Sequence, residues 1–524
     1  MIEFATYPGD WVIVLPVVLC LFGAALLLVL RFARDFHLVL TLAVAGSVAA
    51  CDLALVLRVL EQGPVSMTMG RWLPPFGISF TADLMGATFA FAAAVVTLIL
   101  LVYLQMDAPD RAKRDGLYPL TLLLLAGVSG SFLTGDLFNL YVWFEVMLIA
   151  SFGLMVLGGR NLQLDGTVKY GFLNFLATTF FLVGLGLIYG LTGTLNMADL
   201  IGIAGTVNPA AMASVAALFL LAFGMKAAAF PVNAWLPASY HTPPAAISAL
   251  LAGLLTKVGV YAMLRTLVVV LPAGRDVLEP VLLVVAGATL LLGPMGAIAE
   301  TNLRRALGFL VIGGIGATIA GMALPTREGI AGSAAYILHA MLTMTALYLT
   351  AGLVEKLTGE TDTRKMGGLY AAVSWPSILF FTLILAVSGV PPLLGFWPKL
   401  LLIEAGLDAS GLVAGTVDWA ALVLTVILLG NALLTLIAGT RLWSHIFLRS
   451  GPEGPMSETP NPNLKPLTSR EAWLGVWPVS VLTLIVVVLG LWPQPLFELG
   501  FTAARDLPEP VRYVEAVGLP EAGP

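Results

Sequence analysis

Runs of about 20 apolar residues recur along the whole chain, and they constrain the fold more than any other feature of the sequence. A helix of that length crosses the hydrocarbon core of a bilayer, which is about 30 Å thick. Of the 524 residues 59% are hydrophobic, and only 11% are charged, against about 25% in soluble domains. The mean hydropathy is +0.95. The sequence therefore predicts a polytopic membrane protein.

The apolar runs predict an all-α fold with about 14 transmembrane helices. The expected ranges are 11–31, 36–57, 82–105, 117–134, 137–157, 168–191, 210–240, 245–265, 277–297, 303–323, 330–354, 372–406, 417–446 and 472–495. With the N-terminus outside, the cytoplasmic helix ends and loops hold 16 lysines and arginines, and the opposite side holds seven. Positive residues are enriched on the cytoplasmic side, so this bias predicts that both termini face outward.

Three segments depart from the pattern of apolar runs. Residues 61–81 are rich in glycine, proline and aromatic residues, and we expect an irregular or hairpin-like loop at the outer surface there. The polar, proline-rich stretch 450–470 is predicted to be a cytoplasmic linker before the last helix. The tail from residue 500 is acidic and contains proline, so we expect it to be only partly ordered.

Several classes of site lack a signal in the sequence. There is no basic nucleic-acid patch, no phosphate loop and no clustered Cys/His metal site. Motifs for flavin, haem or iron–sulfur clusters are also absent, so the sequence predicts no bound metal, no cofactor and no nucleic-acid partner. Cys20 and Cys51 lie inside apolar runs, and we expect them to be packing residues.

Five ionisable residues are predicted to lie within the membrane. Lys226, Lys257 and Lys399 are the three lysines that neither side of the membrane accounts for, and Glu145 and His339 also stand well inside predicted helices. A charge at the bilayer centre costs about 2.5–3.5 kcal/mol on insertion scales, so such groups need partners or water and are commonly functional. Structural ion pairs, or side chains that reach the interface, are the alternative explanation.

A buried lysine suits proton transfer. Burial disfavours its charged form, while a neighbouring carboxylate such as Glu145 favours it. Moving or protonating the carboxylate therefore switches the lysine between holding and releasing a proton. Asp136 and His241 are candidates for an accessory role, although both lie nearer helix ends, where an interfacial position explains them equally well.

Two predicted helices contain proline-rich interruptions. FPVNAWLP at 230–237 includes Pro231, and VPPLLGFWP at 390–398 includes Pro391 and Pro392. Proline breaks the turn before it, and non-helical backbone at membrane depth is tolerated only where it lines a cavity or is buried in protein. Two interruptions five helices apart indicate paired repeats and a transport site, whereas two ordinary kinks are the simpler alternative.

The stretch KAAAFPVNAWLPASYHTPPAAISALLAGLLTKVGVYA, at 226–262, resembles the core signature of the antiporter-like subunits shared by respiratory complex I and Mrp-type Na⁺/H⁺ antiporters. The resemblance covers about residues 80–450. Three shorter matches are closer to the D-type subunits of Mrp antiporters: LTGTLNMADL at 191–200, SALLAGLLTKVGVYA at 248–262 and GFWPKLLLIEAGL at 395–407.

The resemblance implies two inverted five-helix repeats, helices 4–8 and 9–13, with helices 7 and 12 discontinuous. It divides the chain into an N-terminal unit, a first repeat, a second repeat and a C-terminal part at 1–116, 117–265, 277–449 and 450–524. It also implies an order for the buried groups. Glu145 would control Lys226, Lys257 and His339 would form a central polar axis, and Lys399 would lie at the exit.

The function that the resemblance implies is proton translocation within a multisubunit Na⁺/H⁺ antiporter, without catalysis by the chain itself. Expected partners are other Mrp subunits, the lipid bilayer, H⁺ and Na⁺, and the expected location is the bacterial inner membrane. A proton-pumping subunit of complex I or of a membrane-bound hydrogenase is one alternative. A self-sufficient secondary transporter is another.

Overall fold

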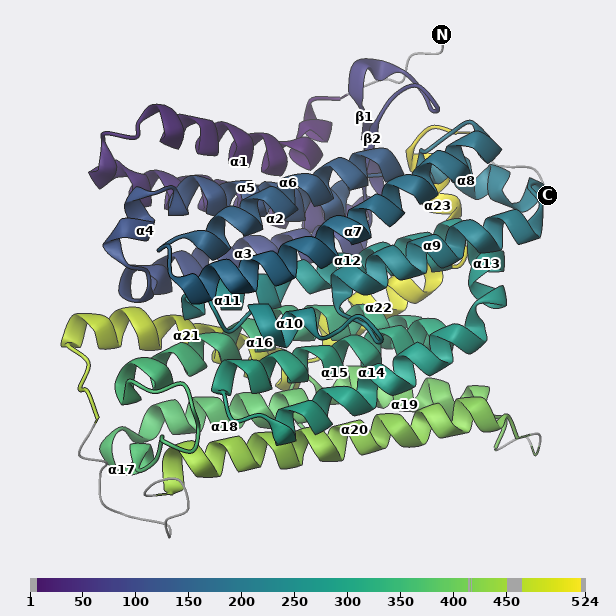
Figure 1. The fold of residues 1–524 in the computed structure, drawn as a ribbon. Coiled ribbons are helices and arrows are strands. Elements are labelled where there is room, and N and C mark those ends of the chain that lie inside the picture. Colours follow the sequence, from purple (N-terminus) through teal and green to yellow (C-terminus); the bar gives the residue numbers. More distant parts are fainter. Residues whose placement is uncertain (1–6, 413–414, 416, 450–463, 520–524) are drawn as a thin grey trace.

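The computed structural model describes residues 7–412, 415, 417–449 and 464–519. Within these residues the chain is mostly helical, and the long helices run side by side along one direction (Figure 1). The N-terminal part contains α1 (Trp11–Val29), α2 (His37–Gln62), β1 (Val65–Thr68), β2 (Ser79–Ala82) and α3 (Leu84–Asp107).

Two larger groups of helices follow. The first contains α4 (Asp110–Arg114), α5 (Leu117–Leu133), α6 (Leu137–Val156), α7 (Asn161–Thr192), α8 (Met197–Ile203), α9 (Pro209–Ala227), α10 (Trp235–Ser239), α11 (Ala245–Leu250) and α12 (Thr256–Met263). The second contains α13 (Pro272–Val277), α14 (Glu279–Ala299), α15 (Leu303–Ala323), α16 (Arg327–Thr358), α17 (Leu369–Ala372), α18 (Ser374–Ser388), α19 (Phe396–Ala409) and α20 (Trp419–Trp443). The chain then forms α21 (Ser469–Leu491), α22 (Gln494–Asp506) and α23 (Val511–Ala516).

Twelve helices in the described part of the chain are long and apolar enough to cross a membrane, by length and composition. Two of the fourteen predicted ranges lack such a helix. The range 117–134 holds the shorter α5, and the range 372–406 is divided between α18 and α19. The polytopic helical fold is therefore confirmed, while the total of fourteen spans and the inversion of the two repeats stay predictions.

Short polar side chains define where several helices begin. The Asp83 carboxylate accepts a hydrogen bond from the backbone N–H of Gly86 at the start of α3, at 2.8 Å. The Thr326 hydroxyl accepts one from Gly329 at the start of α16, at 3.1 Å. Such caps satisfy N–H groups that have no partner within the helix, which is essential near a membrane.

The loop at 61–81 forms a β-hairpin, so the fold is not purely helical. Strands β1 and β2 pair antiparallel, with Val65 opposite Ala82. The Gly135 N–H donates to the Ser79 carbonyl at 2.8 Å, which joins the hairpin to the turn between α5 and α6. The expectation of a hairpin-like loop therefore agrees with the structure.

The two predicted interruptions are real breaks in helices. Helix α9 ends at Ala227, and Pro231 lies in non-helical backbone before α10. Helix α18 ends at Ser388, and the adjacent prolines Pro391 and Pro392 lie before α19. The alternative of simple kinks within continuous helices is wrong.

The two central helices are buried along their whole apolar lengths. One is α16, and the other is a continuous helix from Ala245 to Val270 that includes α11 and α12. This second helix contains π-helical turns at Leu251–Leu255 and Leu264–Val270. Because protein surrounds both helices, polar side chains on them do not have to face lipid.

The C-terminal tail is partly helical. Helices α22 and α23 include residues 500–506 and 511–516 of the segment that we expected to be only partly ordered, and residues 520–524 lie outside the described residues. Helix α22 is amphipathic, and it packs against α16, where the Gly500 backbone meets Ala331. A buried apolar face therefore orders this tail despite its acidic composition. Residues 450–463 of the predicted linker lie outside the described residues.

Candidate functional site

The five predicted residues come from five different helices. Glu145 is on α6, Lys226 on α9, Lys257 on α12, His339 on α16 and Lys399 on α19. The three lysines and the histidine are each at most 5% exposed, and Glu145 is partly buried. Within the described residues no carboxylate lies within 4 Å of any of these lysines. The lysines are therefore not structural ion pairs.

Lys226 lies in the last turn of α9, immediately before the first break. Its ammonium lies 4.8 Å from the centre of the Phe144 ring, a cation–π contact, and it interacts electrostatically with Glu145 without an ion pair. One oxygen of the Glu145 carboxylate is buried and has no hydrogen-bond partner in the described part of the chain. The carboxylate and the ammonium are thus near each other but separate.

A cavity of about 10 Å³ adjoins Lys226 and is also lined by Asn174, Trp235 and Tyr240. The Tyr240 hydroxyl is buried without a hydrogen-bond partner among the described residues. A cavity of this size is at the lower limit for one water molecule, and its polar lining supplies donors and acceptors. The site can therefore hold a water molecule against the Lys226 ammonium.

The first break is stabilised by contacts of its own. The Trp235 indole N–H donates to the Met225 carbonyl at the end of α9, at 3.0 Å. Ala228 follows with a φ of 62°, the left-handed conformation that glycine usually provides at a helix end. The Phe230 N–H donates to the Thr289 hydroxyl of α14, which connects the break to the second group of helices.

Lys257 is held by a carbonyl on its own helix. Its ammonium donates to the Ala252 carbonyl at 2.5 Å, and Ala252 lies in the π-helical turn at Leu251–Leu255. A π-helical turn changes the usual i→i−4 hydrogen bonding, and such turns are frequent at functional sites. The turn therefore provides an acceptor for a lysine that has no carboxylate partner.

His339 and Lys257 line the same cavity. Its volume is about 20 Å³, and Tyr336 and Thr318 also line it. The Nδ1 atom of His339 lies 3.1 Å from the Thr343 hydroxyl, and its ring meets the Tyr336 ring edge-on at 5.3 Å. This cavity is large enough for one water molecule between the lysine and the histidine.

Lys399 lies after the second break and reaches back to the end of α18. Its ammonium donates to the carbonyls of Val387 and Ser388, both at 3.0 Å. These are among the last carbonyls of α18, which have no partner within the helix and carry the negative end of its dipole. A half-helix end therefore holds this charge in place of a carboxylate.

Two glycines at the second break make room for these side chains. A Cβ on Gly389, whose φ is 86°, would lie 2.7 Å from Cδ of Lys399. A Cβ on Gly395 would lie 2.9 Å from Nε2 of His339. His339 and Lys399 thus approach the same non-helical segment from two helices.

The five predicted residues are called the buried row below: Glu145, Lys226, Lys257, His339 and Lys399. The two accessory candidates are not part of this row. Asp136 caps α6 by accepting from the Asn139 N–H at 2.8 Å, and burial raises the pKa of its carboxyl to about 6. His241 lies just after α10, and its Nδ1 is 2.9 Å from the Pro237 carbonyl. Their geometry supports structural roles at helix ends.

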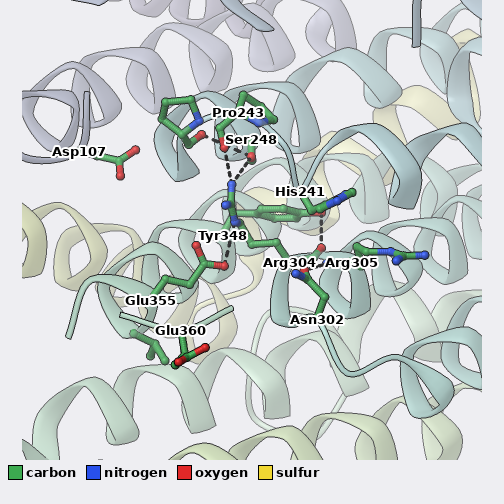
Figure 2. Close-up of polar contacts among 12 residues, drawn as sticks. Asp107, His241, Pro243, Ser248, Asn302, Arg304, Arg305, Tyr348, Glu355 and Glu360 are labelled. Carbon is green, nitrogen blue, oxygen red and sulfur yellow. Dashed lines mark hydrogen bonds and ion pairs between the residues drawn. The ribbon is translucent and has the colours of Figure 1, made fainter. Parts of the chain in front are cut away.

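His241 belongs to a separate cluster of polar residues around Arg304 (Figure 2). The Arg304 guanidinium pairs with Glu355 at 2.9 Å and donates to the Ser248 hydroxyl at 3.1 Å and to the Pro243 carbonyl. This cluster joins the break after α10 and the start of α11 to α15 and α16. Arg304 is one of the 16 lysines and arginines at the predicted cytoplasmic helix ends and loops, and it is buried.

Sequence reasoning also missed buried acidic residues. Asp52 is fully buried within α2, and neither of its carboxyl oxygens has a hydrogen-bond partner among the described residues. Asp83 and Arg265 form a buried ion pair. The sequence alone identifies Asp52, because it is an acidic residue within an apolar run. The pairing of Asp83 with Arg265, 182 positions apart, can be recognised only from the fold.

A polytopic helical bundle with a row of buried ionisable groups beside two broken helices defines the class of ion-translocating membrane subunits. Residues 134–427 match the family model described as "NADH:quinone oxidoreductase/Mrp antiporter, TM". The D-type Na(+)/H(+) antiporter subunit of Alkalihalophilus pseudofirmus is 35% identical over 508 residues, which cover 96% of this chain and 99% of that protein. The chain belongs to the NADH:quinone oxidoreductase/Mrp antiporter family.

Two solved structures are similar to this chain. A chain in the structure of the Mrp complex from Dietzia sp. DQ12-45-1b is 32% identical with a TM-score of 0.87, and the match covers 98% of this chain and 100% of that one. A chain of respiratory complex I from Thermus thermophilus is 24% identical with a TM-score of 0.78, covering 95% of this chain and 99% of that one. The second likeness is one of fold alone.

Proposed function

We propose that this chain is the proton-translocating D-type subunit of a multisubunit Na⁺/H⁺ antiporter. It assembles with other Mrp subunits in the bacterial inner membrane, with both termini on the outer side. The name of the relative from Alkalihalophilus pseudofirmus and the likeness to a chain of the Dietzia Mrp complex support this assignment. The more distant likeness to complex I makes a redox-driven pump the weaker alternative.

The proposal rests on the groups that surround the three buried lysines. Each is surrounded by carbonyls, an aromatic ring or a water-sized cavity, with no carboxylate at ion-pair distance within the described residues. A lysine held in this way can lose its proton without leaving an unpaired buried carboxylate behind. This is the property that a relay needs.

In the proposed path, protons pass between Glu145 and Lys399 through Lys226, Lys257 and His339. The cavity beside Lys226 and the cavity between Lys257 and His339 each supply room for a bridging water. Helices α9 and α12 bring the two halves of the path together, because the Gly259 backbone packs against Ala227. Movement of the Glu145 carboxylate toward or away from Lys226 would control the first transfer.

The test uses the whole antiporter complex reconstituted in vesicles with a pH-sensitive dye. Replacing Glu145 by alanine is expected to reduce Na⁺-dependent proton flux to the level of empty vesicles, while the complex still assembles. A matched control is Glu404→Ala, which removes an exposed carboxylate from α19. Near-normal flux in the Glu145→Ala complex would refute the role of this carboxylate.

A further inference from the structure

A polar cavity of about 560 Å³ lies beside α22 and the start of α16. Four charged side chains line it: Arg327, Glu498, Arg505 and Glu509. Arg505 is paired with Asp506 at 2.7 Å. The Arg327 guanidinium lies 5.1 Å from the centre of the Phe501 ring, and within the described residues neither Arg327 nor Glu498 has an ion-pair partner. Glu509 also has no ion-pair partner among these residues, so one cation and two anions are free to bind a ligand.

A second cavity of about 360 Å³ lies between α2, α3, α16, α21 and α22. Its lining is almost entirely apolar and includes Phe91, Leu342 and Leu489. Glu498 lines this cavity as well as the polar one, so the two cavities meet at its side chain. Together they form one amphipathic site on the same helices.

The dimensions of the site match one leaflet of a bilayer. Arg327 at the polar end and Leu342 at the apolar end are 15 residues apart on α16, or about 22 Å along the helix axis. Half of a bilayer, headgroups included, is about 20–22 Å thick. A molecule that fills both cavities must therefore have a charged end at the interface and a hydrocarbon end near the membrane centre.

We propose that this site binds one phospholipid with a zwitterionic amine headgroup. The phosphate would bind Arg327, the ammonium would bind Glu498, and an acyl chain would occupy the apolar cavity as far as Leu342. The charges of the residues that line the polar cavity favour this headgroup over an anionic one. An anionic headgroup would satisfy Arg327 but would be repelled by Glu498 and Glu509, whereas an amine headgroup satisfies both signs.

The site places the lipid beside the proposed proton path without making it part of that path. Leu338 and Leu342 line the apolar cavity, and His339 follows Leu338 on the same turn of α16. The acyl chain would therefore support the buried helix that carries His339.

The test is photolabelling of the intact complex in vesicles of phosphatidylethanolamine and phosphatidylglycerol in equal amounts. Either lipid carries a photoreactive group at the end of one acyl chain, and mass spectrometry locates the label. We expect phosphatidylethanolamine to label peptides around Leu342 and Leu489. We expect labelling by phosphatidylglycerol at these positions to be about tenfold weaker, the loss of one charge-assisted contact.

The variants Arg327→Gln and Glu498→Gln should each reduce this labelling about tenfold. The matched control is Arg31→Gln, because the Arg31 guanidinium also lies over a phenylalanine ring, 4.7 Å from its centre, but outside both cavities. Ala92→Phe fills the apolar cavity and should remove the label from Leu342. Thermal unfolding confirms that each variant is folded.

Three outcomes would overturn the proposal. Equal labelling by the two lipids would show ordinary lipid contact at the surface. Labelling that survives Ala92→Phe would place the acyl chain elsewhere. A cross-link from this site to another subunit in place of lipid would show that a protein helix fills it.

Discussion

At the residue scale, the buried lysines are held by neutral groups and not by carboxylates. Lys257 donates to a carbonyl in a π-helical turn, and Lys399 donates to two carbonyls at a helix end. Lys226 lies over an aromatic ring. Neutral acceptors stabilise an ammonium less than a carboxylate does, so each lysine can exchange its proton at a smaller cost.

Lys399 offers a direct test of this arrangement. Lys399→Ala removes the donor to Val387 and Ser388 and is expected to lower Na⁺-dependent proton flux at least tenfold, which corresponds to about 1.4 kcal/mol in the rate-limiting barrier. Lys399→Glu should keep part of the flux, because a protonated carboxyl can donate to one of the same carbonyls. Flux assays on reconstituted complexes measure both, and full activity of Lys399→Ala would contradict the proposed role.

The residues of the row could be predicted from the sequence because each is an ionisable side chain in an apolar run. Their partners could not be predicted. The carbonyls that bind Lys399 become acceptors only because α18 ends at Ser388, and the carbonyl that binds Lys257 lies in a π-helical turn that has no sequence signature here. Asp52 is different, because it is an acidic residue within the apolar run 36–57 and the sequence alone identifies it.

At the scale of elements, the two broken helices position the charged groups. The end of α9 carries Lys226, and the end of α18 accepts Lys399. Proline patterns predicted both breaks, since proline has no N–H to continue a helix. The sequence did not predict that each helix would end in a left-handed residue, Ala228 in one case and Gly389 in the other.

Gly389→Ala tests the geometry of the second break. The new methyl group would lie 2.7 Å from Cδ of Lys399, and a left-handed alanine costs about 1–2 kcal/mol. We expect a lower thermal unfolding temperature and reduced proton flux, because Lys399 must move from the end of α18. The measurements are thermal unfolding and the vesicle flux assay.

Gly430→Ala is the matched control for that substitution. Gly430 lies within α20, and a Cβ there would meet no atom within 4 Å. Alanine also favours a helix over glycine by up to about 1 kcal/mol, so stability should be equal or slightly higher. If Gly389→Ala and Gly430→Ala have the same unfolding temperature and the same proton flux, the present geometry of the second break is not required.

At the scale of the whole molecule, the helices that carry the centre of the row are shielded from lipid. Helix α16 and the helix from Ala245 to Val270 are surrounded by other helices, whereas α1, α2 and α20 keep exposed apolar faces. The start of α1 and helix α23 lie at the same end of the bundle (Figure 1). The orientation of the two ends across the membrane stays a prediction of the positive-inside bias.

The polytopic helical organisation was predictable, because the length of an apolar run is a signal that extends over many residues. The packing of helix α22 could not be predicted from the sequence. Its apolar residues fit a contact with the membrane, with a partner or with the rest of this chain equally well. The structure shows the internal contact, with Leu496 and Leu499 buried. Tertiary packing therefore stabilises the helix that begins the acidic tail.

If protons cross the protein through the buried row, the loss of the Lys226 side chain must stop them. Na⁺-dependent proton flux is measured in vesicles that hold the complete complex, with Lys226→Ala compared with Lys169→Ala. Lys169 is exposed on α7 and paired with Asp165, so its loss should leave the flux unchanged. We expect the Lys226→Ala complex to assemble normally and to show no flux above empty vesicles. Near-normal flux in that complex would rule out the proposed proton path.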